Sequence, residues 1–400
     1  MNRSLLALPL GAALSLSLVA CLDGDDADPS PDPDDVLLEP PAPDQGVQFQ
    51  MTTTLEPGVE AEHCLFVRGP DREMWVTRDE VRFEKGSHHV LLYETDYDQI
   101  PTVTEDGVAV DTSGVFDCSQ GATQGWRITK LVGGSQNGDG ESMLRFPPGV
   151  AMPVRAGAVL LMNVHYINAS DQPIEPEARI NVYTIPEDEV VTEGDLLFLY
   201  NPLIRVPAQG SSRARWRCPV HHDITIANVQ SHMHARGIGY AARVGDGEPF
   251  YENDAWANVD VRSFEPGLRV TAGSTLDYYC DYRSSEDHDI YQGARSTDEM
   301  CMLIGSYYPA DPSTSRCLDE GGQDLAGEWV GEGDASCADT MGCILSIDLG
   351  AGDPLPPITE CMDAADPTVS REASAVVRCM MSSADPVTAC AEPMAACQAR

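Results

Sequence analysis

The alternation of apolar and polar residues between positions 47 and 325 constrains the fold of this chain most strongly. Short runs such as "VLLMNVHYI" and "ITIANVQSHMH" are separated by segments such as "FPPG" and "PAQG". Alternation with a period of two is typical of strands with one buried face, and Pro- and Gly-rich segments end strands in turns. Long helical periodicity is absent from this region. We therefore predict that it is all-β.

The composition changes at "TIPEDEVVTEGD", residues 184–195, which reads as a joint between two β domains. Each part has the length of an antiparallel β-sandwich. We predict two consecutive sandwiches of jelly-roll type, the first at residues 47–188 and the second at residues 189–325.

Residues 330–400 differ from the rest, because they favour helices and contain six cysteines between Cys337 and Cys397. Asp366 followed by Pro367 is typical of a helix start. We predict a small Cys-rich helical module. The sequence does not choose among the possible disulfide pairings, nor among three roles: docking an unknown partner, capping the β domains or resisting proteolysis.

The N-terminus predicts export. Residues 1–20 have one Arg and an apolar run too short to span a bilayer, as in a signal peptide. Their end, "LVAC", resembles a bacterial lipobox that would be cleaved and lipidated at Cys21; the alternative is an ordinary signal peptide with a chance cysteine. Residues 21–46 are acidic and Pro-rich, as in a tether. We expect a protein whose lipid anchor holds it on a bacterial cell-envelope membrane, facing the periplasm or the cell surface.

The charge of the chain limits its partners. With 64 Asp and Glu against 25 Lys and Arg, the net charge is −39, so nucleic acids and anionic membrane surfaces would be repelled. Membrane contact is then expected through the anchor alone. Without Cys21, twelve cysteines remain, an even number that predicts disulfides in an exported protein.

Five histidines stand out as candidate metal ligands. His232 and His234 are two apart on a predicted strand and share a face, while Met233 points away. His88 and His89 are adjacent, so their joint ligation requires a bulge or a strand end, which Gly86 favours. His165 lies on an apolar run. The alternative is that the HxH pair decorates a surface or core and that His165 is a hydrogen-bonded core residue.

The metal is suggested by the ligand types. Imidazoles suit zinc, copper, iron and nickel, and a thioether favours Cu(I). Met300 in "DEMC" could supply that thioether, although a methionine is more commonly core filler.

In order, the chain carries HH, VHY, HxH and DEMC, followed by Tyr307-Tyr308. This series resembles the copper type II ascorbate-dependent monooxygenases, the family of peptidylglycine α-hydroxylating monooxygenase and dopamine β-monooxygenase, over about residues 47–325. His63, His221, His222 and His288 match no ligand position of the family.

The resemblance implies two copper ions, O₂, a small organic substrate and ascorbate or a similar reductant. The first copper would supply an electron, and its implied ligands are His88, His89 and His165. The second would do the C–H chemistry, and its implied catalytic ligands are His232, His234 and Met300. The implied disulfides are Cys64–Cys118, Cys218–Cys317 and Cys280–Cys301.

Three candidate substrate-pocket residues depart from the peptidylglycine members. Gln230 replaces an Arg that holds the substrate carboxylate, Asn163 replaces a Gln, and Ile304 replaces a Tyr. An amide cannot form the bidentate salt bridge of an Arg, so a C-terminal glycine peptide is a poor candidate substrate.

Three functional hypotheses follow. The first is a copper- and O₂-dependent monooxygenase that hydroxylates an activated C–H bond. The second is a non-catalytic copper-binding lipoprotein that stores, senses or delivers the metal. The third is a structural or interaction protein that merely inherited the ligand residues. Product formation driven by ascorbate separates the first hypothesis from the others.

Overall fold

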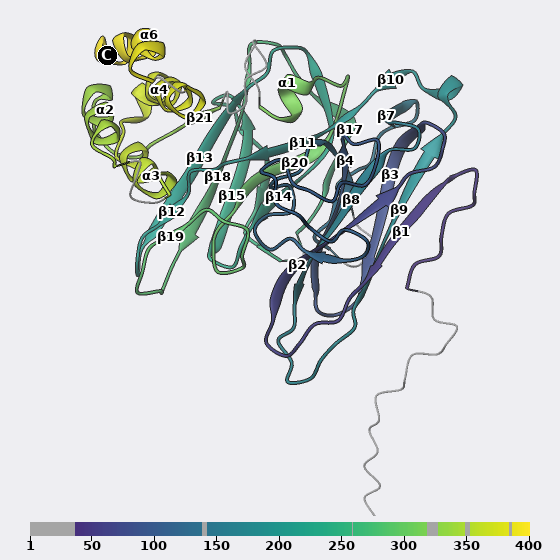
Figure 1. Ribbon diagram of the computed structural model, residues 1–400. Coiled ribbons are helices and arrows are strands. Elements are labelled where there is room, and N and C mark those ends of the chain that lie inside the picture. The colour runs from purple at the N-terminus through teal and green to yellow at the C-terminus, as the bar shows by residue number, and fades with distance from the viewer. Residues whose placement is uncertain (1–36, 138–141, 258, 318–326, 349–352, 384–385) are drawn as a thin grey trace, which may run out of the picture. The chain divides into compact units, whose positions relative to one another are not determined.

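The computed structural model describes residues 37–137, 142–257, 259–317, 327–348, 353–383 and 386–400 (Figure 1). The predicted signal peptide, Cys21 and the tether up to residue 36 lie outside this part. In the part that is described, no helix is both long enough and apolar enough to cross a membrane. Strands dominate up to Tyr308 and helices dominate from Cys337 onward, which confirms the predicted fold class.

Two five-stranded sheets form the first sandwich, and apart from the parallel pair β7–β10 all their neighbouring strands are antiparallel. One sheet contains, in spatial order, β1 (Gly46–Thr52), β9 (Glu177–Ile185), β3 (Met74–Phe83), β7 (Val150–Val154) and β10 (Thr192–Glu193). The other contains β5 (Phe116–Asp117), β2 (Glu60–Arg68), β8 (Val159–Ile167), β4 (Ser87–Thr95) and β6 (Ile128–Ser135).

Strand β8 is buried on both of its faces. Met162 and Val164 belong to the buried cluster that also contains Ile180 of the opposite sheet. Asn163 and His165 alternate with them and are also buried, with exposed fractions of 0% and 1%. Because successive strand residues point to opposite faces, His165 is directed away from the core of its own sandwich.

The end of the predicted tether contacts the first sandwich. The Leu38 carbonyl accepts hydrogen bonds from Gln48 Nε2 at 2.9 Å and from an Arg179 guanidinium nitrogen at 3.1 Å. Asn181 Nδ2 donates to the Glu39 carbonyl at 2.8 Å. The Leu38 side chain is only 8% exposed. The last residues of the predicted tether therefore pack against the first sandwich.

Two antiparallel sheets also form the second sandwich. One contains β11 (Asp195–Tyr200), β20 (Cys301–Tyr308), β14 (Ile224–Met233) and β17 (Arg262–Val270). The other contains β16 (Pro249–Asn253), β15 (Gly237–Val244), β18 (Thr275–Arg283), β13 (Ser211–Pro219) and β21 (Glu328–Trp329). The short elements are η1 (Glu187–Glu189), the pair β12 (Arg205–Val206) and β19 (Ile290–Tyr291), and α1 (Pro312–Ser315).

The C-terminal helices pack on the second sandwich, beside β13 and β21 (Figure 1). They are α2 (Cys337–Leu345), α3 (Leu355–Asp363), η2 (Pro367–Val369), α4 (Ser370–Ser382), α5 (Pro386–Ala389) and α6 (Ala391–Gln398). The Asp366 side chain accepts a hydrogen bond from the Thr368 backbone N–H at 2.8 Å, which confirms the predicted helix start.

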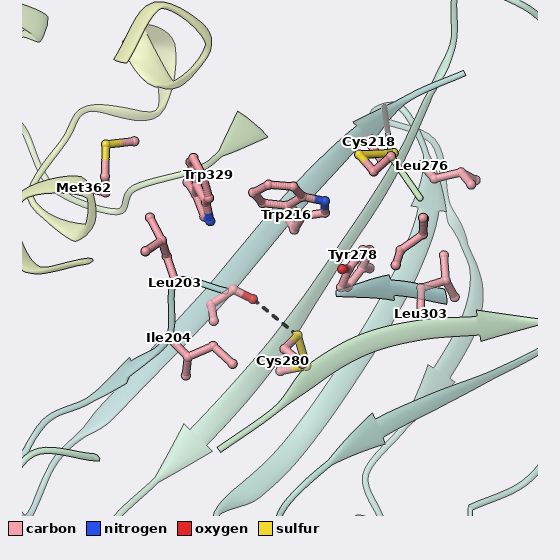
Figure 2. Close-up of a cluster of buried hydrophobic side chains, with 14 of the residues drawn as sticks. Leu203, Ile204, Trp216, Cys218, Leu276, Tyr278, Cys280, Leu303, Trp329 and Met362 are labelled. Atoms are coloured by element: carbon pink, nitrogen blue, oxygen red, sulfur yellow. Dashed lines mark hydrogen bonds between the residues drawn. A yellow bond between two sulfur atoms is a disulfide. The ribbon is translucent and has the colours of Figure 1, made fainter. Parts of the chain in front are cut away.

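Trp329 of β21, directly before the module, connects the core of the second sandwich to it, and its backbone N–H donates to the Ser374 hydroxyl of α4 at 2.9 Å. The Trp329 and Trp216 rings meet edge to face with their centroids 4.7 Å apart, and Met362 of α3 lies in the same buried cluster as Tyr278 (Figure 2). Trp329 Nε1 also donates to Asn201 Oδ1 at 3.1 Å. The module therefore caps the sandwich, one of the three roles that the sequence left open.

Six disulfides crosslink the described chain. Those of the β region join Cys64 to Cys118, Cys218 to Cys317 and Cys280 to Cys301, the same pairs that the resemblance implies. Those of the module join Cys337 to Cys397, Cys343 to Cys361 and Cys379 to Cys390.

Candidate metal centre

A bulge in β4 lets the side chains of the adjacent residues His88 and His89 belong to the same group of potential metal ligands. The pairing of β4 with β8 shifts register between Ser87 and His89, so His88 is an extra residue in the strand. Gly86 has a φ of +102°, and a Cβ there would lie 2.5 Å from Ile174 Cδ1, so the turn before the bulge requires glycine. A bulge is one of the two features, with a strand end, that allow adjacent histidines to ligate one metal.

His88, His89 and His165 converge in the first sandwich. One ring nitrogen from each lies within 4.8 Å of those from the other two. His89 and His165 are direct cross-strand neighbours, and their ring centroids are 5.2 Å apart. Nδ1 of each of these two rings is buried and has no hydrogen-bond partner among the described residues. Buried polar atoms are seldom left unpaired, so this group has the character of a metal site.

His232 and His234 form a second group at the end of β14. Their ring centroids are 5.3 Å apart. Met233 lies between them with no exposed surface and belongs to the core of the second sandwich, on the opposite face, as the alternation predicts. Nε2 of His234 is buried without a hydrogen-bond partner in the described part of the chain.

Met300 is the residue directly before β20, and β20 is the neighbour of β14, the strand that leads to His232 and His234. His232 is opposite Met302 in the β14–β20 pairing, and Met300, two residues earlier, shares the face of Met302. Met300 packs against the cluster of the first sandwich. Its carbonyl accepts a hydrogen bond from the Tyr282 hydroxyl at 2.7 Å, and the Cys280–Cys301 disulfide follows directly.

Hydrogen-bond acceptors select one tautomer of three of these histidines. His234 Nδ1 donates to the Asp298 carbonyl at 3.0 Å, and His165 Nε2 donates to Glu60 Oε1 at 2.9 Å. In each ring the nitrogen without a partner then carries the lone pair. These are Nε2 of His234 and Nδ1 of His165.

His232 is held in the same manner across the two sandwiches. Its Nδ1 donates to Gln136 Oε1 at 2.9 Å. The Gln136 amide is oriented by its Nε2, which donates to the Ser231 carbonyl at 2.7 Å. His232 therefore keeps its lone pair on Nε2, the nitrogen that a metal would bind.

Burial keeps these imidazoles neutral. Desolvation lowers the pKa of His88 and the pKa of His234 to about 4. It lowers the pKa of His89 and the pKa of His232 well below the usual value, and it lowers the pKa of His165. A neutral imidazole is the form that binds a metal, so the group is ready to bind a cation at neutral pH.

The two histidine groups are adjacent. The ring centroids of His89 and His232 are 6.2 Å apart. Near them Asn137 and Val259 exchange two hydrogen bonds between the sandwiches, at 2.8 and 3.2 Å. Met302 and Ile304 of β20 belong to the buried cluster of the first sandwich. The five histidines therefore form one cluster across a packed interface.

Glu299 fixes the strand end that carries His234, a role that the motif comparison missed. Its carboxylate accepts the backbone N–H groups of His234 at 3.1 Å and of Arg236 at 2.9 Å. Burial raises the pKa of Glu299 to about 7. The acidic residue directly before Met300 in "DEMC" was the available sequence signal for this contact.

The candidate substrate-pocket residues are all buried. The exposed fractions of Asn163, Gln230 and Ile304 are 0%, 1% and 4%. Gln230 and Ile304 are cross-strand neighbours, and Gln136 Nε2 lies 3.4 Å from Gln230 Oε1. Asn163 Nδ2 donates to Glu62 Oε2 at 3.1 Å. Gln230 and Ile304 thus lie beside the His232 group, whereas Asn163 lies in the sheet of the first group.

The remaining histidines lie elsewhere. His63 pairs with Thr53 at 2.8 Å, His222 with Asp311 at 3.0 Å and His288 with Asp287 at 3.1 Å. None of these three, nor His221, belongs to the group of His88, His89 and His165. Trp256, which the motifs did not single out, is 38% exposed, and its ring centroid lies 6.2 Å from that of His88.

Comparison with known proteins gave a family match over the second sandwich. Residues 196–327 match the family model of the copper type II ascorbate-dependent monooxygenase, C-terminal domain, which supports the resemblance that the motifs indicate. A search of curated proteins gave no match.

Two viral capsid proteins are among the similar solved structures. The major capsid protein P2 from bacteriophage PM2 has 12% identity and a TM-score of 0.27, covering 64% of this chain and 97% of its own. The STIV major capsid protein has 10% identity and a TM-score of 0.26, covering 65% and 92%. At such scores neither similarity bears on fold or function.

Proposed function

We propose that this chain, whose second sandwich belongs to the copper type II ascorbate-dependent monooxygenase family, is a copper- and O₂-dependent monooxygenase. It would hydroxylate an activated C–H bond of a small organic substrate with electrons from ascorbate or a similar reductant. The observation that carries the proposal is the cluster of five neutral histidines, of which four are buried and His88 is half-buried. Three of its ring nitrogens, His89 Nδ1, His165 Nδ1 and His234 Nε2, have no hydrogen-bond partner in the described chain.

The donor types fit two copper ions. His88, His89 and His165 would hold the first in an all-nitrogen site, which tolerates both oxidation states. His232, His234 and Met300 would hold the second, where two imidazoles and a soft thioether favour Cu(I). When bound, the two ions supply one electron each and a position at which O₂ reacts.

The side chains of this protein prepare the site in three ways. Burial keeps the imidazoles neutral, and the acceptors Gln136, Asp298 and Glu60 direct the ring lone pairs of His232, His234 and His165 to defined nitrogens. Packing of the two sandwiches buries four of the five histidines, which limits their contact with bulk water. Such preorganisation lowers the cost of reorganising the site during reaction.

The substrate is proposed to bind near Gln230 and Ile304, beside the His232 group. Gln230 Nε2 is buried and has no hydrogen-bond partner among the described residues, so it can donate to a substrate oxygen. A neutral amide favours a polar, uncharged group over a carboxylate. We also propose that the protein is exported and lipid-anchored through Cys21.

A second candidate function is a non-catalytic copper-binding lipoprotein that stores, senses or delivers the metal. The observation that favours it is the burial of Gln230, Asn163 and Ile304, none more than 4% exposed. A substrate that contacts them would have to enter a closed interface.

Copper stoichiometry of the purified full chain tests the proposal. The wild type should bind two copper ions, and the His232→Ala/His234→Ala variant should bind one. Oxygen consumption and product formation with ascorbate should then be measured over a panel of small organic substrates. A wild type without copper contradicts both functions, whereas two coppers without turnover of any substrate favour the second.

A further inference from the structure

The Glu60 carboxylate connects the two sandwiches at the edge of the histidine cluster. Glu60 Oε1 accepts from His165 Nε2 at 2.9 Å and from the Ser296 backbone N–H at 2.7 Å. Glu60 Oε2 accepts from the Ser296 hydroxyl at 2.7 Å. Glu60 begins β2 of the first sandwich, whereas Ser296 lies between β19 and β20 of the second.

Ser296 belongs to a short loop, residues 292–300, that contacts the second histidine group. In this Ser296 loop the Asp298 carbonyl accepts from His234 Nδ1, and Glu299 accepts the backbone N–H of His234. The loop ends at Met300. Internal hydrogen bonds, from Gly293 N to the Glu299 carbonyl and from Asp298 N to the Arg295 carbonyl, stiffen it. Its position therefore affects His234 and Met300 together.

We propose that Glu60 is a positioning residue that sets the first metal ligand and the Ser296 loop relative to one another. Its bond to His165 leaves Nδ1 as the ligating nitrogen, and its two bonds to Ser296 hold the loop that supports His234 and precedes Met300. The inference rests on the proposed copper function. Carboxylates that accept a hydrogen bond from the free ring N–H of a ligating histidine orient the ring and raise its basicity, and their loss typically lowers metal affinity about 10- to 100-fold.

Two substitutions separate geometry from charge. In Glu60→Gln, the amide oxygen can accept from His165 Nε2 and the Ser296 N–H, while the amide nitrogen donates to the Ser296 hydroxyl oxygen. All three hydrogen bonds can therefore persist without the negative charge. Glu60→Ala loses the hydrogen bonds and the charge.

The matched control is Glu84→Ala. Glu84 Oε2 also accepts a backbone N–H, that of Glu177 at 2.7 Å, but both residues lie in the first sandwich. Its loss should leave the Ser296 loop and the histidine cluster unchanged.

The test combines two measurements on the full chain. Hydrogen exchange of copper-free protein reports the Ser296 loop directly. Cu(II) affinity and the electron paramagnetic resonance spectrum, measured in the His232→Ala/His234→Ala background, report the first site alone. We expect Glu60→Ala to speed exchange across residues 292–300, to weaken Cu(II) binding about 10- to 100-fold and to change the spectrum. Glu60→Gln should keep the slow exchange and show an intermediate affinity.

Unchanged exchange and an unchanged Cu(II) spectrum in a folded Glu60→Ala variant would overturn the proposal. Faster exchange with an unchanged spectrum would overturn the ligand-positioning part, because Glu60 would then be an inter-sandwich contact only. A wild type that binds no copper contradicts the proposed function and the ligand part together. The exchange measurement, made without copper, still decides the part that concerns the loop.

Discussion

Replacing Met233 should mainly lower the stability of this protein, whereas replacing Met300 should mainly affect metal binding. Met233 has no exposed surface and lies in the core of the second sandwich. Its Cβ and Sδ are each 2.8 Å from the place that a Cβ on Gly237 would occupy, so the surrounding packing is tight. Met233→Ala should therefore lower the free energy of unfolding by about 2–5 kcal/mol, the range for truncating a buried methionine.

Met300 is only half-buried, at the interface with the first sandwich. Met300→Ala should cost less stability, about 1–2 kcal/mol, because part of its surface already contacts solvent. Its main effect is expected on metal binding: the variant should lose the proposed copper–sulfur contact and the proposed oxygenase activity, while the first copper remains.

Leucine variants separate packing from ligation. Met→Leu conserves volume and usually costs less than about 1.5 kcal/mol, but leucine has no sulfur. Urea unfolding should therefore show small changes for Met233→Leu and Met300→Leu. X-ray absorption of the Cu(I) protein should show sulfur at copper in Met233→Leu but not in Met300→Leu. The reverse result would refute the assignment of Met300 and the register from which it is argued.

Three further predictions concern stability. Trp329→Ala should lower the free energy of unfolding by about 3–5 kcal/mol and make the C-terminal module sensitive to limited proteolysis. Leu345→Ala, at a side chain of the module that is 56% exposed, should change it by less than about 0.5 kcal/mol. Burial raises the pKa of Asp79 from 3.8 to about 8. Between these two values the native state keeps a proton that the unfolded state releases. The difference in free energy of unfolding between the wild type and Asp79→Asn should therefore fall by about 1.4 kcal/mol per pH unit as the pH rises from 5 to 7. Copper at about 100 times its dissociation constant should stabilise the wild type by about 2.7 kcal/mol per site, and His165→Ala should reduce this gain in calorimetry.

Each of these has an outcome that contradicts it. Equal proteolysis of Trp329→Ala and Leu345→Ala would mean that the tryptophan does not hold the module. A constant difference between wild type and Asp79→Asn across this pH range would mean that Asp79 is ionised in the native state. An undiminished copper effect in His165→Ala would remove that residue from the ligand set.

The strands and the ligand motifs could be predicted because their signals are local. Period-two alternation assigns Met233 to the core and His232 to the opposite face without knowledge of any partner strand. Joint ligation by the adjacent pair His88-His89, after Gly86, requires a bulge or a strand end, and the structure has a bulge at that position. In both places the backbone geometry follows from residues a few positions apart.

The residues that support the cluster could not be predicted, because their contacts depend on how the two sandwiches pack. Gln136 and His232 are 96 positions apart, and Glu60 and Ser296 are 236 apart. Nothing in a single strand pattern indicates which glutamine or glutamate will face a histidine of the other domain. The closeness of the two histidine groups depends on the same packing.

The position of β21 at the edge of its sheet protects the molecule from self-association. β21 has two residues and forms the end of its sheet beside β13, and α4 packs against it. A long unpaired strand would offer a row of free N–H and C=O groups to which another chain could add. The short strand β21 and helix α4 cover this edge of the sheet. Removing the chain from residue 327 onward would therefore leave β13 as an unpaired edge strand. Such a truncated protein should form intermolecular sheets instead of remaining a smaller soluble protein.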